Sequence, residues 1–269
     1  MVSTPRTELF KDIKRVVVKL GTRVVTVHQN ELNHTAIQKL AEDVAELKSS
    51  GVQVAIVSSG AVGAGMGRLG LKARPSRIPE LQATAAVGQG LLMNAYKQAF
   101  RDHGVAIGQV LLTADDLDDR RRYVNVRNTL EELFRLGAVP IVNENDSIAI
   151  EEIRVGDNDR LSALVAHLID ANLLVVFTNV DGLFSDDPNQ NRDAEFFPVV
   201  DEVTSEMIER AGEGRSDLGL GGMRTKLQAA ESVTLGGRMM VIANGLTTRI
   251  TDLLSGKEVG TLFLAGKGQ

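Results

Sequence analysis

Two lysines lie where a phosphate group could be bound. Lys19 interrupts the apolar run 15–20 just before Gly21, and Lys226 follows the glycine-rich stretch 219–222 near the start of a helical pattern. A glycine lets an anion approach backbone N–H groups closely, and a neighbouring ammonium neutralises its charge. The N-terminal amides of a helix attract anions in the same way. Each lysine alone could also be a solvated surface residue, but together they favour a site for phosphate chemistry.

Three other stretches of the chain carry polar side chains that could bind a ligand. The residues from Asn143 to Asp146 come directly after an apolar run, and those from Asp157 to Asp159 open a helical pattern. Two such loops could bind a small amino compound or a metal-bound phosphate, although the second could equally be a helix N-cap. The turn at Ser59–Gly60 suits a ligand held by backbone N–H groups, or a close contact between helix and sheet.

Several common catalytic motifs are missing from the sequence. There is no P-loop, no protein-kinase motif set, no G-x-S-x-G elbow and no H-E-x-x-H. The stretch Gly65–Gly70 spells G-x-G-x-x-G, but it lies well beyond the strand that ends near Ser58, so we discount a dinucleotide site. With no cysteine, and four histidines that never pair at ligand spacing, we expect no protein-held metal.

Charge and composition restrict the partners. A formal net charge of −5 and an aromatic content of 4% argue against nucleic acid as a ligand. No apolar run reaches the roughly 18 residues of a membrane span, and the N-terminal 15 residues lack the apolar core of a secretory signal. We therefore expect a cytoplasmic protein with neither a nucleic-acid nor a membrane partner.

Hydrophobic periodicity predicts alternating strands and helices. Strands are expected at 15–20, 24–27, 53–58, 105–112, 138–142, 173–178, 238–242 and 260–264, and helices at 35–50, 79–101, 119–136, 159–170, 204–211 and 223–235. We interpret 24–27 as a hairpin arm and 260–264 as an edge strand. The alternation implies right-handed crossovers and a mainly parallel sheet. We predict a three-layer αβα sandwich, one α/β domain over 1–269, with ligands beyond the carboxyl ends of the strands.

Five segments taken together resemble the amino acid kinase superfamily. They are Val17–Thr22, Val57–Ala61, Asn143–Asp146, Gly156–Asp159 and Gly221–Lys226. The V-K-L-G-T start is shared by sister kinases, whereas N-E-N-D, G-D-N-D and G-G-M-x-T-K in this order are more specific. The resemblance runs from about residue 15 to 263, and within the superfamily the chain is similar to the members that phosphorylate glutamate.

The resemblance implies the amino acid kinase fold and a reaction. The γ-phosphoryl group of ATP, accompanied by Mg²⁺, would be transferred to the side-chain carboxylate of L-glutamate, giving L-glutamyl 5-phosphate for proline biosynthesis. Lys19 and Lys226 would stabilise the transferring phosphoryl group, and Asp159 would hold both lysines. Glutamate-binding roles are implied for Ser59, Gly60, Asn143, Asp146 and Asn158. Nucleotide-binding roles are implied for Lys19, Gly21, Thr178, Asn179, Leu220, Gly221, Gly222, Met223, Arg224, Thr225 and Lys226.

Further expectations come from the same resemblance. Residues of about 15–170 would bind mainly glutamate, and those of about 171–269 mainly ATP. Proline would inhibit at or near the glutamate site, a glutamyl-phosphate reductase would accept the labile product, and the chain would assemble as a homo-oligomer, a dimer or tetramer. Many bacterial members also carry a C-terminal PUA domain, so we expect a catalytic domain without it. Asn179, Leu220 and Arg224 depart from the residues common in relatives, which puts their nucleotide contacts in doubt.

Other functions are compatible with the same residues. A sister kinase acting on aspartate, acetylglutamate or UMP could use the same lysine and glycine features, although Asp146 favours a free amino acid over a nucleotide. A non-catalytic nucleotide-binding sensor on the same fold is a second alternative, which the joint presence of Lys19, Asp159 and Lys226 disfavours. An NAD-dependent oxidoreductase would depend on Gly65–Gly70 alone.

Overall fold

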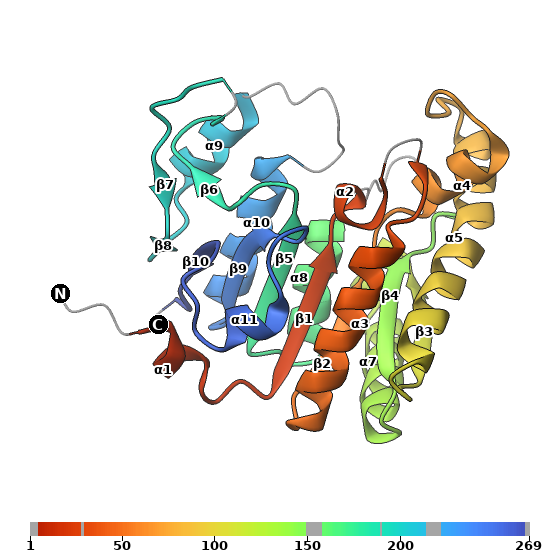
Figure 1. The fold of residues 1–269 in the computed structure, drawn as a ribbon, viewed down its shortest axis with the longest axis horizontal. Helices are drawn as coiled ribbons and strands as arrows, with labels where there is room; N and C mark the ends of the chain where they lie inside the picture. Colours follow the sequence, from red (N-terminus) through yellow and green to blue (C-terminus); the bar gives the residue numbers. More distant parts are fainter. Residues whose placement is uncertain (1–4, 28–29, 149–157, 189, 214–221, 267–269) are drawn as a thin grey trace.

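A mainly parallel sheet lies at the centre of the computed structural model, which describes residues 5–27, 30–148, 158–188, 190–213 and 222–266 (Figure 1). Its strands lie in the order β3-β4-β2-β1-β5-β9-β10-β8, and only β10 and β9 pair antiparallel. The strands are β1 (Arg15–Leu20), β2 (Gln53–Val57), β3 (Ile107–Leu112), β4 (Val139–Glu144), β5 (Leu173–Thr178), β8 (Val199–Val200), β9 (Met239–Asn244) and β10 (Thr261–Phe263). A separate antiparallel pair consists of β6 (Leu183–Phe184) and β7 (Phe196–Phe197).

Helices cover both faces of this sheet (Figure 1). One face carries α3 (His34–Ser49), α5 (Ile78–Arg101) and α11 (Ile250–Leu254), and the other carries α7 (Arg120–Arg135), α8 (Asn158–Leu168) and α10 (Met223–Leu235). The shorter or peripheral helices are α1 (Arg6–Phe10), α2 (Thr22–Val25), α4 (Ala61–Leu69), α6 (Ala114–Asp118) and α9 (Ser205–Glu213). Two separate clusters of buried apolar side chains fill the spaces between the layers. The predicted three-layer αβα sandwich is confirmed.

Strand β1 shows how the sheet divides the two cores. Val16, Val18 and Leu20 belong to the apolar cluster that includes α3 and α5, whereas Val17 belongs to the cluster that includes α8 and α10. The strand is buried on both faces because β2 and β5 flank it and helices cover it, which explains the continuous apolar run. Since side chains alternate along a strand, Lys19 lies on the face of Val17, toward α8.

Most of the predicted elements are confirmed, and β5 and α10 match the prediction to the residue. The hairpin arm predicted at 24–27 is wrong for Val24 and Val25, which belong to the short helix α2. Only Thr26 of the predicted span pairs as a strand would, in an isolated antiparallel bridge with Leu32. The N–H groups of Val24 and Val25 both donate to the carbonyl oxygen of Gly21, at 2.9 and 3.2 Å. These two valines are 2% and 1% exposed, so burial in the core has outweighed the strand preference of β-branched residues.

The edge strand predicted at 260–264 is also wrong in one respect. The segment does form β10, but β10 lies between β9 and β8 and is therefore not the edge of the sheet. The outermost strand β8 has only two residues, Val199 and Val200. Two residues are too few to produce an alternating pattern in the sequence.

The glycines of the G-x-G-x-x-G stretch belong to α4, and one of them, Gly65, serves helix packing. They lie within or at the end of α4, not in a turn between a strand and a helix. A Cβ atom on Gly65 would lie 1.9 Å from the carbonyl oxygen of Thr84, and one on Gly88 would lie 1.7 Å from that of Ala61. Only glycine allows α4 and α5 to approach this closely. In this protein the motif belongs to a contact between two helices. It therefore gives no support to a dinucleotide site.

Candidate active site

A buried carboxylate joins the two lysines singled out in the sequence. Asp159 Oδ1 lies 2.5 Å from Lys19 Nζ, and Asp159 Oδ2 lies 3.0 Å from Lys226 Nζ. The hydroxyl of Thr225 donates to the same Oδ2 at 3.1 Å. Asp159 is 0% exposed, Lys19 4% and Lys226 5%. Residues far apart in the chain therefore form one buried ionic cluster, which we call the lysine–aspartate cluster (Lys19, Asp159 and Lys226).

The fold explains why these three side chains meet. Lys19 is near the carboxyl end of β1 and lies on the face covered by α8. Asp159 is in the first turn of α8, and Lys226 is in the first turn of α10. Helices α8 and α10 pack against each other, so their N-terminal ends lie together above the end of β1. Both helix dipoles add positive potential at this point.

The charges of the cluster do not cancel. Burial by itself would raise the pKa of Asp159, but the attraction of Lys19 and Lys226 outweighs burial and holds the pKa below its usual range. The carboxylate is thus ionised at neutral pH, as buried ion pairs require. Two ammonium groups against one carboxylate leave a formal charge of +1. A buried pair of ammonium groups at two helix N-termini is suited to binding a phosphate group.

The residue next to Asp159 organises a second group of polar side chains. Asn158 Nδ2 donates to the carbonyl oxygen of Ser58 at 2.7 Å, to Ser59 Oγ at 2.9 Å and to Asn143 Oδ1 at 3.1 Å. The other end of the amide, Asn158 Oδ1, is buried and has no hydrogen-bond partner among the described residues. A buried acceptor without a partner costs free energy unless a ligand supplies a donor. Asn158 therefore offers an acceptor to a bound molecule.

Two carboxylates at the end of β4 and just beyond it, Glu144 and Asp146, have raised pKa values. Burial, and then the nearby charge of Asp146, raise the pKa of Glu144 to about 7. Burial raises the pKa of Asp146 to about 6, while Arg74 acts in the opposite direction. Asp146 is therefore mostly ionised at neutral pH although it lies in an unfavourable environment. A cationic ligand such as an ammonium group would relieve this cost.

The predicted nucleotide residues lie where β1 and β5 end side by side. The N–H of Gly21 donates to the carbonyl oxygen of Phe177 at 2.9 Å, and a Cβ on Gly21 would lie 3.2 Å from that oxygen. Thr178 is the last residue of β5 and is 8% exposed, and Asn179 follows it. Gly21, Thr178 and Asn179 thus lie at one end of the sheet, next to the end of β1 that carries Lys19.

The remaining predicted residues divide into those at helix starts and those outside the described ranges. Gly60 precedes α4 and has a φ of 98°, a left-handed conformation that favours glycine. Gly222 precedes α10, and Met223 and Arg224 begin that helix. Leu220 and Gly221, like Asp157, lie outside the described residues.

Sequence reasoning missed one residue of the polar group. Gln89 lies on α5, and its Oε1 accepts a hydrogen bond from Asn143 Nδ2 at 2.8 Å. A single glutamine within a long helical pattern gives no sign of its role. The one sign in the sequence is that Gln89 lies between Gly88 and Gly90. Two glycines without side chains indicate that another part of the protein can approach α5 closely at this position.

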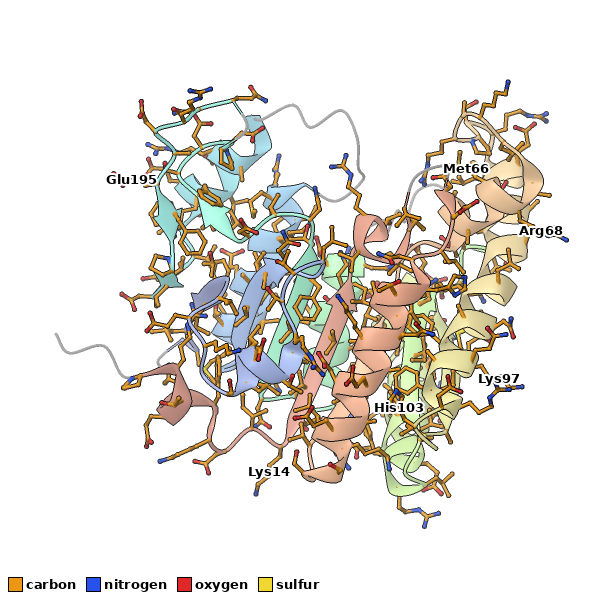
Figure 2. The ribbon with its side chains drawn as sticks, in the orientation of Figure 1. Lys14, Met66, Arg68, Lys97, His103 and Glu195 are labelled. Atoms are coloured by element: carbon orange, nitrogen blue, oxygen red, sulfur yellow. The ribbon has the colours of Figure 1, made fainter. Side chains whose placement is uncertain are left out.

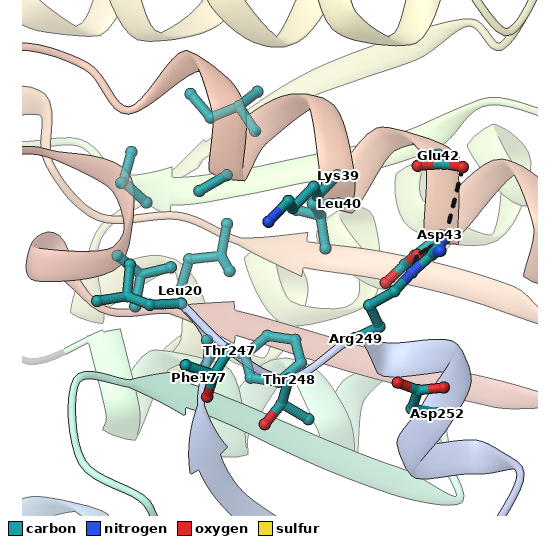
Figure 3. Close-up of a pocket in the computed structure, with 16 residues that line it drawn as sticks. Leu20, Lys39, Leu40, Glu42, Asp43, Phe177, Thr247, Thr248, Arg249 and Asp252 are labelled. Atoms are coloured by element: carbon teal, nitrogen blue, oxygen red, sulfur yellow. Dashed lines mark hydrogen bonds and ion pairs between the residues drawn. The ribbon is translucent and has the colours of Figure 1, made fainter.

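Other polar features of the molecule lie away from these residues. A cavity of about 310 Å³ lies between α3 and the segment 245–252, and Figure 3 shows Arg249 paired with Asp43 at its rim. None of the predicted site residues lines it. Figure 2 places His103 far from Met66 of α4, at the end of the molecule where the strands begin. The lysine–aspartate cluster and the polar group around Asn158 are the features that the fold brings together.

A model of the amino acid kinase family matches residues 14–244 of this chain. The crystal structure of the T. acidophilum isopentenyl phosphate kinase product complex has a similar fold, with a TM-score of 0.63 and 19% sequence identity. The similarity covers 93% of this chain and 100% of that one. The chain belongs to the amino acid kinase family.

Comparison with curated relatives shows which members of the family this chain is similar to. The chain is 52% identical over 252 residues to the glutamate 5-kinase of Moorella thermoacetica, which covers 93% of this chain and 67% of the relative. It is 45% identical over 263 residues to the glutamate 5-kinase of Clostridium tetani, which covers 97% of this chain and 98% of the relative. A third glutamate 5-kinase, from Geobacter metallireducens, is 46% identical and is covered over 70% of its length. Within the family, the chain groups with the glutamate 5-kinases.

Proposed function

We propose that the protein transfers the γ-phosphoryl group of ATP to the side-chain carboxylate of L-glutamate, giving L-glutamyl 5-phosphate and ADP. This is the first step of proline biosynthesis from glutamate. A carboxylate oxygen attacks the γ-phosphorus while the bond from that phosphorus to the bridging β–γ oxygen breaks, and ADP leaves with the electron pair. The observation that carries this proposal for the chain's own residues is the lysine–aspartate cluster, a buried cationic site where three elements converge.

The chemistry needs positioning and charge compensation more than it needs a base. A carboxylate is already a nucleophile at neutral pH, so no group has to remove a proton from it. The difficulty is to bring an anion toward a polyanion and to stabilise the charge spread over the moving phosphoryl group. We propose that Lys19 and Lys226 supply this stabilisation and that Asp159 fixes the positions of both ammonium groups.

We assign the amino-acid end of glutamate to the polar group around Asn158. Asn158 Oδ1 has no hydrogen-bond partner among the described residues, and Asp146 is an anion in a partly buried environment, so both suit the α-ammonium group. Ser59 and Asn143 hold the Asn158 amide in place through hydrogen bonds of 2.9 and 3.1 Å. Gly60 precedes α4 in a left-handed conformation, and we assign its backbone N–H to the same end of the substrate.

We assign the nucleotide to the neighbouring strand ends and to the start of α10. Gly21, Thr178 and Asn179 lie at the ends of β1 and β5, and the residues from Gly222 to Lys226 form the start of α10. Residues of about 15–170 would then bind mainly glutamate and those of about 171–269 mainly ATP. The central pairing of β1 with β5 supports this division, because the two parts of the sheet meet there.

We propose that Mg²⁺ arrives bound to ATP as part of the substrate. Oxygen atoms of substrate phosphates are usual ligands of this ion. In the described ranges, no group of three histidine or acidic side chains is placed to hold a metal. The nucleotide phosphates would therefore be the principal ligands, and the lysines would act on the same phosphate oxygens from the protein side.

Four further expectations remain proposals. Proline would compete near Asp146 and Asn158, because it carries an ammonium and a carboxylate on one carbon as glutamate does. A glutamyl-phosphate reductase would accept the labile acyl phosphate, the chain would form a homo-oligomer, and its location would be cytoplasmic. Within the described ranges, no helix combines the length and the apolar character that crossing a bilayer requires.

A kinase assay across several acceptors tests the proposed function. Glutamate, aspartate, acetylglutamate and UMP are each supplied with MgATP, and hydroxylamine traps any acyl phosphate as a hydroxamate while ADP release is followed. We expect hydroxamate and ADP in equal amounts with glutamate and far less of either with the other acceptors. Phosphorylation of UMP without phosphorylation of glutamate would overturn the substrate assignment.

A further inference from the structure

The amide of Gln89 has only one orientation that its surroundings allow. The backbone N–H of Glu144 donates to Asn143 Oδ1 at 2.9 Å, and Asn158 Nδ2 donates to the same oxygen. A backbone N–H can only donate, so this oxygen of Asn143 is identified by its partner. Asn143 Nδ2 must therefore be the atom that faces Gln89, and Gln89 must present its Oε1 to it.

This orientation leaves a donor unused. Gln89 Nε2 is buried and has no hydrogen-bond partner in the part of the chain that the structure describes. The amide of Asn158 is oriented in the same way, because its Nδ2 donates to the carbonyl oxygen of Ser58, and its Oδ1 is left free. One chain of hydrogen bonds, from Gln89 through Asn143 to Asn158, thus ends in a free donor on one side and a free acceptor on the other.

An α-amino acid carries the complementary pair of groups on one carbon atom. Its ammonium can donate to the free acceptor, and its α-carboxylate can accept from the free donor. The side-chain carboxylate of glutamate cannot be the partner of Gln89 in the proposed reaction, because it must meet the phosphoryl group near Lys19 and Lys226. The α-carboxylate is the acidic group that remains.

We infer that Gln89 is a further substrate-binding residue, whose Nε2 donates to the α-carboxylate of glutamate and so selects an acceptor with a free α-carboxylate. The inference rests on the proposed function, since it names a contact of the same substrate. It also explains why α5 places a polar side chain beside the buried Asn143 and the half-buried Asn158. Hydrogen bonds to a charged partner are stronger than those between neutral groups, so this donor contributes to affinity as well as orientation.

The variant Gln89→Glu separates this role from simple support of Asn143. Glutamate at this position keeps an oxygen that can accept from Asn143 Nδ2, but it replaces the free donor by an anionic acceptor. The acceptors compared are L-glutamate and L-glutamate α-amide, which differ only in the α group. We expect the KM for glutamate to rise about 10- to 100-fold, the ratio for one lost hydrogen bond to a charged group, with kcat changed less than about 3-fold. The KM for ATP should stay the same.

The ratio of kcat/KM for the two acceptors is the decisive measurement. In the unmodified protein it should favour glutamate, and in Gln89→Glu it should fall by about 100-fold, because the new carboxylate repels the α-carboxylate and can accept from the α-amide. Gln98→Glu provides the matched control, since Gln98 lies on the same helix with its side chain exposed. It should leave both acceptors unaffected.

Each outcome has a defined meaning. An equal loss for both acceptors in Gln89→Glu, or no loss for either, would overturn the inference and leave Gln89 as a support for Asn143. If Gln89→Glu does not fold, Gln89→Met is measured instead, and an unchanged ratio in that variant would also overturn it. Turnover of glutamate by the unmodified protein is established first, so a failure of the proposed function itself is recognised separately.

Discussion

Replacing Asp159 by asparagine should affect stability and turnover together. The side chain keeps its size and loses its charge. At an effective dielectric constant of about 20, the ion pairs at 2.5 and 3.0 Å are worth about 7 and about 6 kcal/mol before desolvation and the repulsion between the lysines are subtracted. In Asp159→Asn two buried ammonium groups would face each other without an anion. We expect the free energy of unfolding to fall by about 3–5 kcal/mol, the usual cost of breaking a buried ion pair.

The loss of catalysis should accompany this change even where the variant is folded. The lysines would no longer be held at fixed positions, and we expect kcat to fall at least about 100-fold, as for removal of a preorganised charge-stabilising group. Urea unfolding and steady-state kinetics at a temperature where the variant is native measure the two effects. A bound nucleotide could restore part of the stability, because its phosphates supply the missing negative charge.

A matched control exists on the same segment of chain. Asp170 also pairs with two cations, Arg127 at 3.1 Å and Arg238 at 2.9 Å, but its side chain is 62% exposed. Asp170→Asn should cost less than about 1 kcal/mol, as for surface ion pairs, and should leave kcat unchanged. Equal stability losses for Asp159→Asn and Asp170→Asn, or wild-type kcat in Asp159→Asn, would refute the reasoning.

Three further predictions follow from the site and from the helix contact. Lys226→Met should lower kcat at least about 100-fold with little change in the KM for glutamate; a kcat within a few-fold of wild type would remove this lysine from the mechanism. The pKa of Asp146 is raised to about 6, so the carboxylate gains protons as the pH falls through 6 and no longer pairs with an ammonium. The KM for glutamate should therefore rise about tenfold per pH unit below that value. The variant Asp146→Asn should bind glutamate more weakly at every pH and should lack this pH dependence; equal pH profiles for the two proteins would contradict the assignment. Gly88→Ala, whose Cβ would lie 1.7 Å from the carbonyl oxygen of Ala61, should destabilise the fold by about 1–3 kcal/mol or more, whereas Gly90→Ala, with open space, should not; equal melting temperatures would disprove the close contact.

Most of the fold could be predicted from the chain because its strands are buried on both faces. Such strands appear as short apolar runs ending at glycine or polar residues, and β5 was located to the residue on that basis. Helix α10 was located equally well from its helical periodicity. The pattern failed where burial depended on distant contacts. Val24 and Val25 look like a strand, but the core that receives them is built from other parts of the chain, and they adopt a helical turn to reach it.

The candidate site was predictable only in part for the same reason. Lys19, Asp159 and Lys226 each lie beside a glycine or a helix start, which are local features, and the family resemblance linked them. Glycines also appear for unrelated reasons, as Gly65 and Gly88 do in the helix contact. Gln89 could not have been found, because its importance comes from the orientation of Asn143, which is determined by the folded arrangement alone.

The adjacency of Asn158 and Asp159 has a consequence for substrate size. One residue is bonded to the side chains that we assign to the amino-acid head, and the next anchors the ammonium groups that we assign to the phosphoryl group. Consecutive residues in a helical turn cannot move apart. The distance between the site for the amino-acid head and the site for the phosphoryl group is therefore fixed. Aspartate is one methylene shorter, so its side-chain carboxylate would not reach the phosphorus when its α-ammonium and α-carboxylate groups are bound. The helix backbone thereby selects acceptors by the length of their carbon chain.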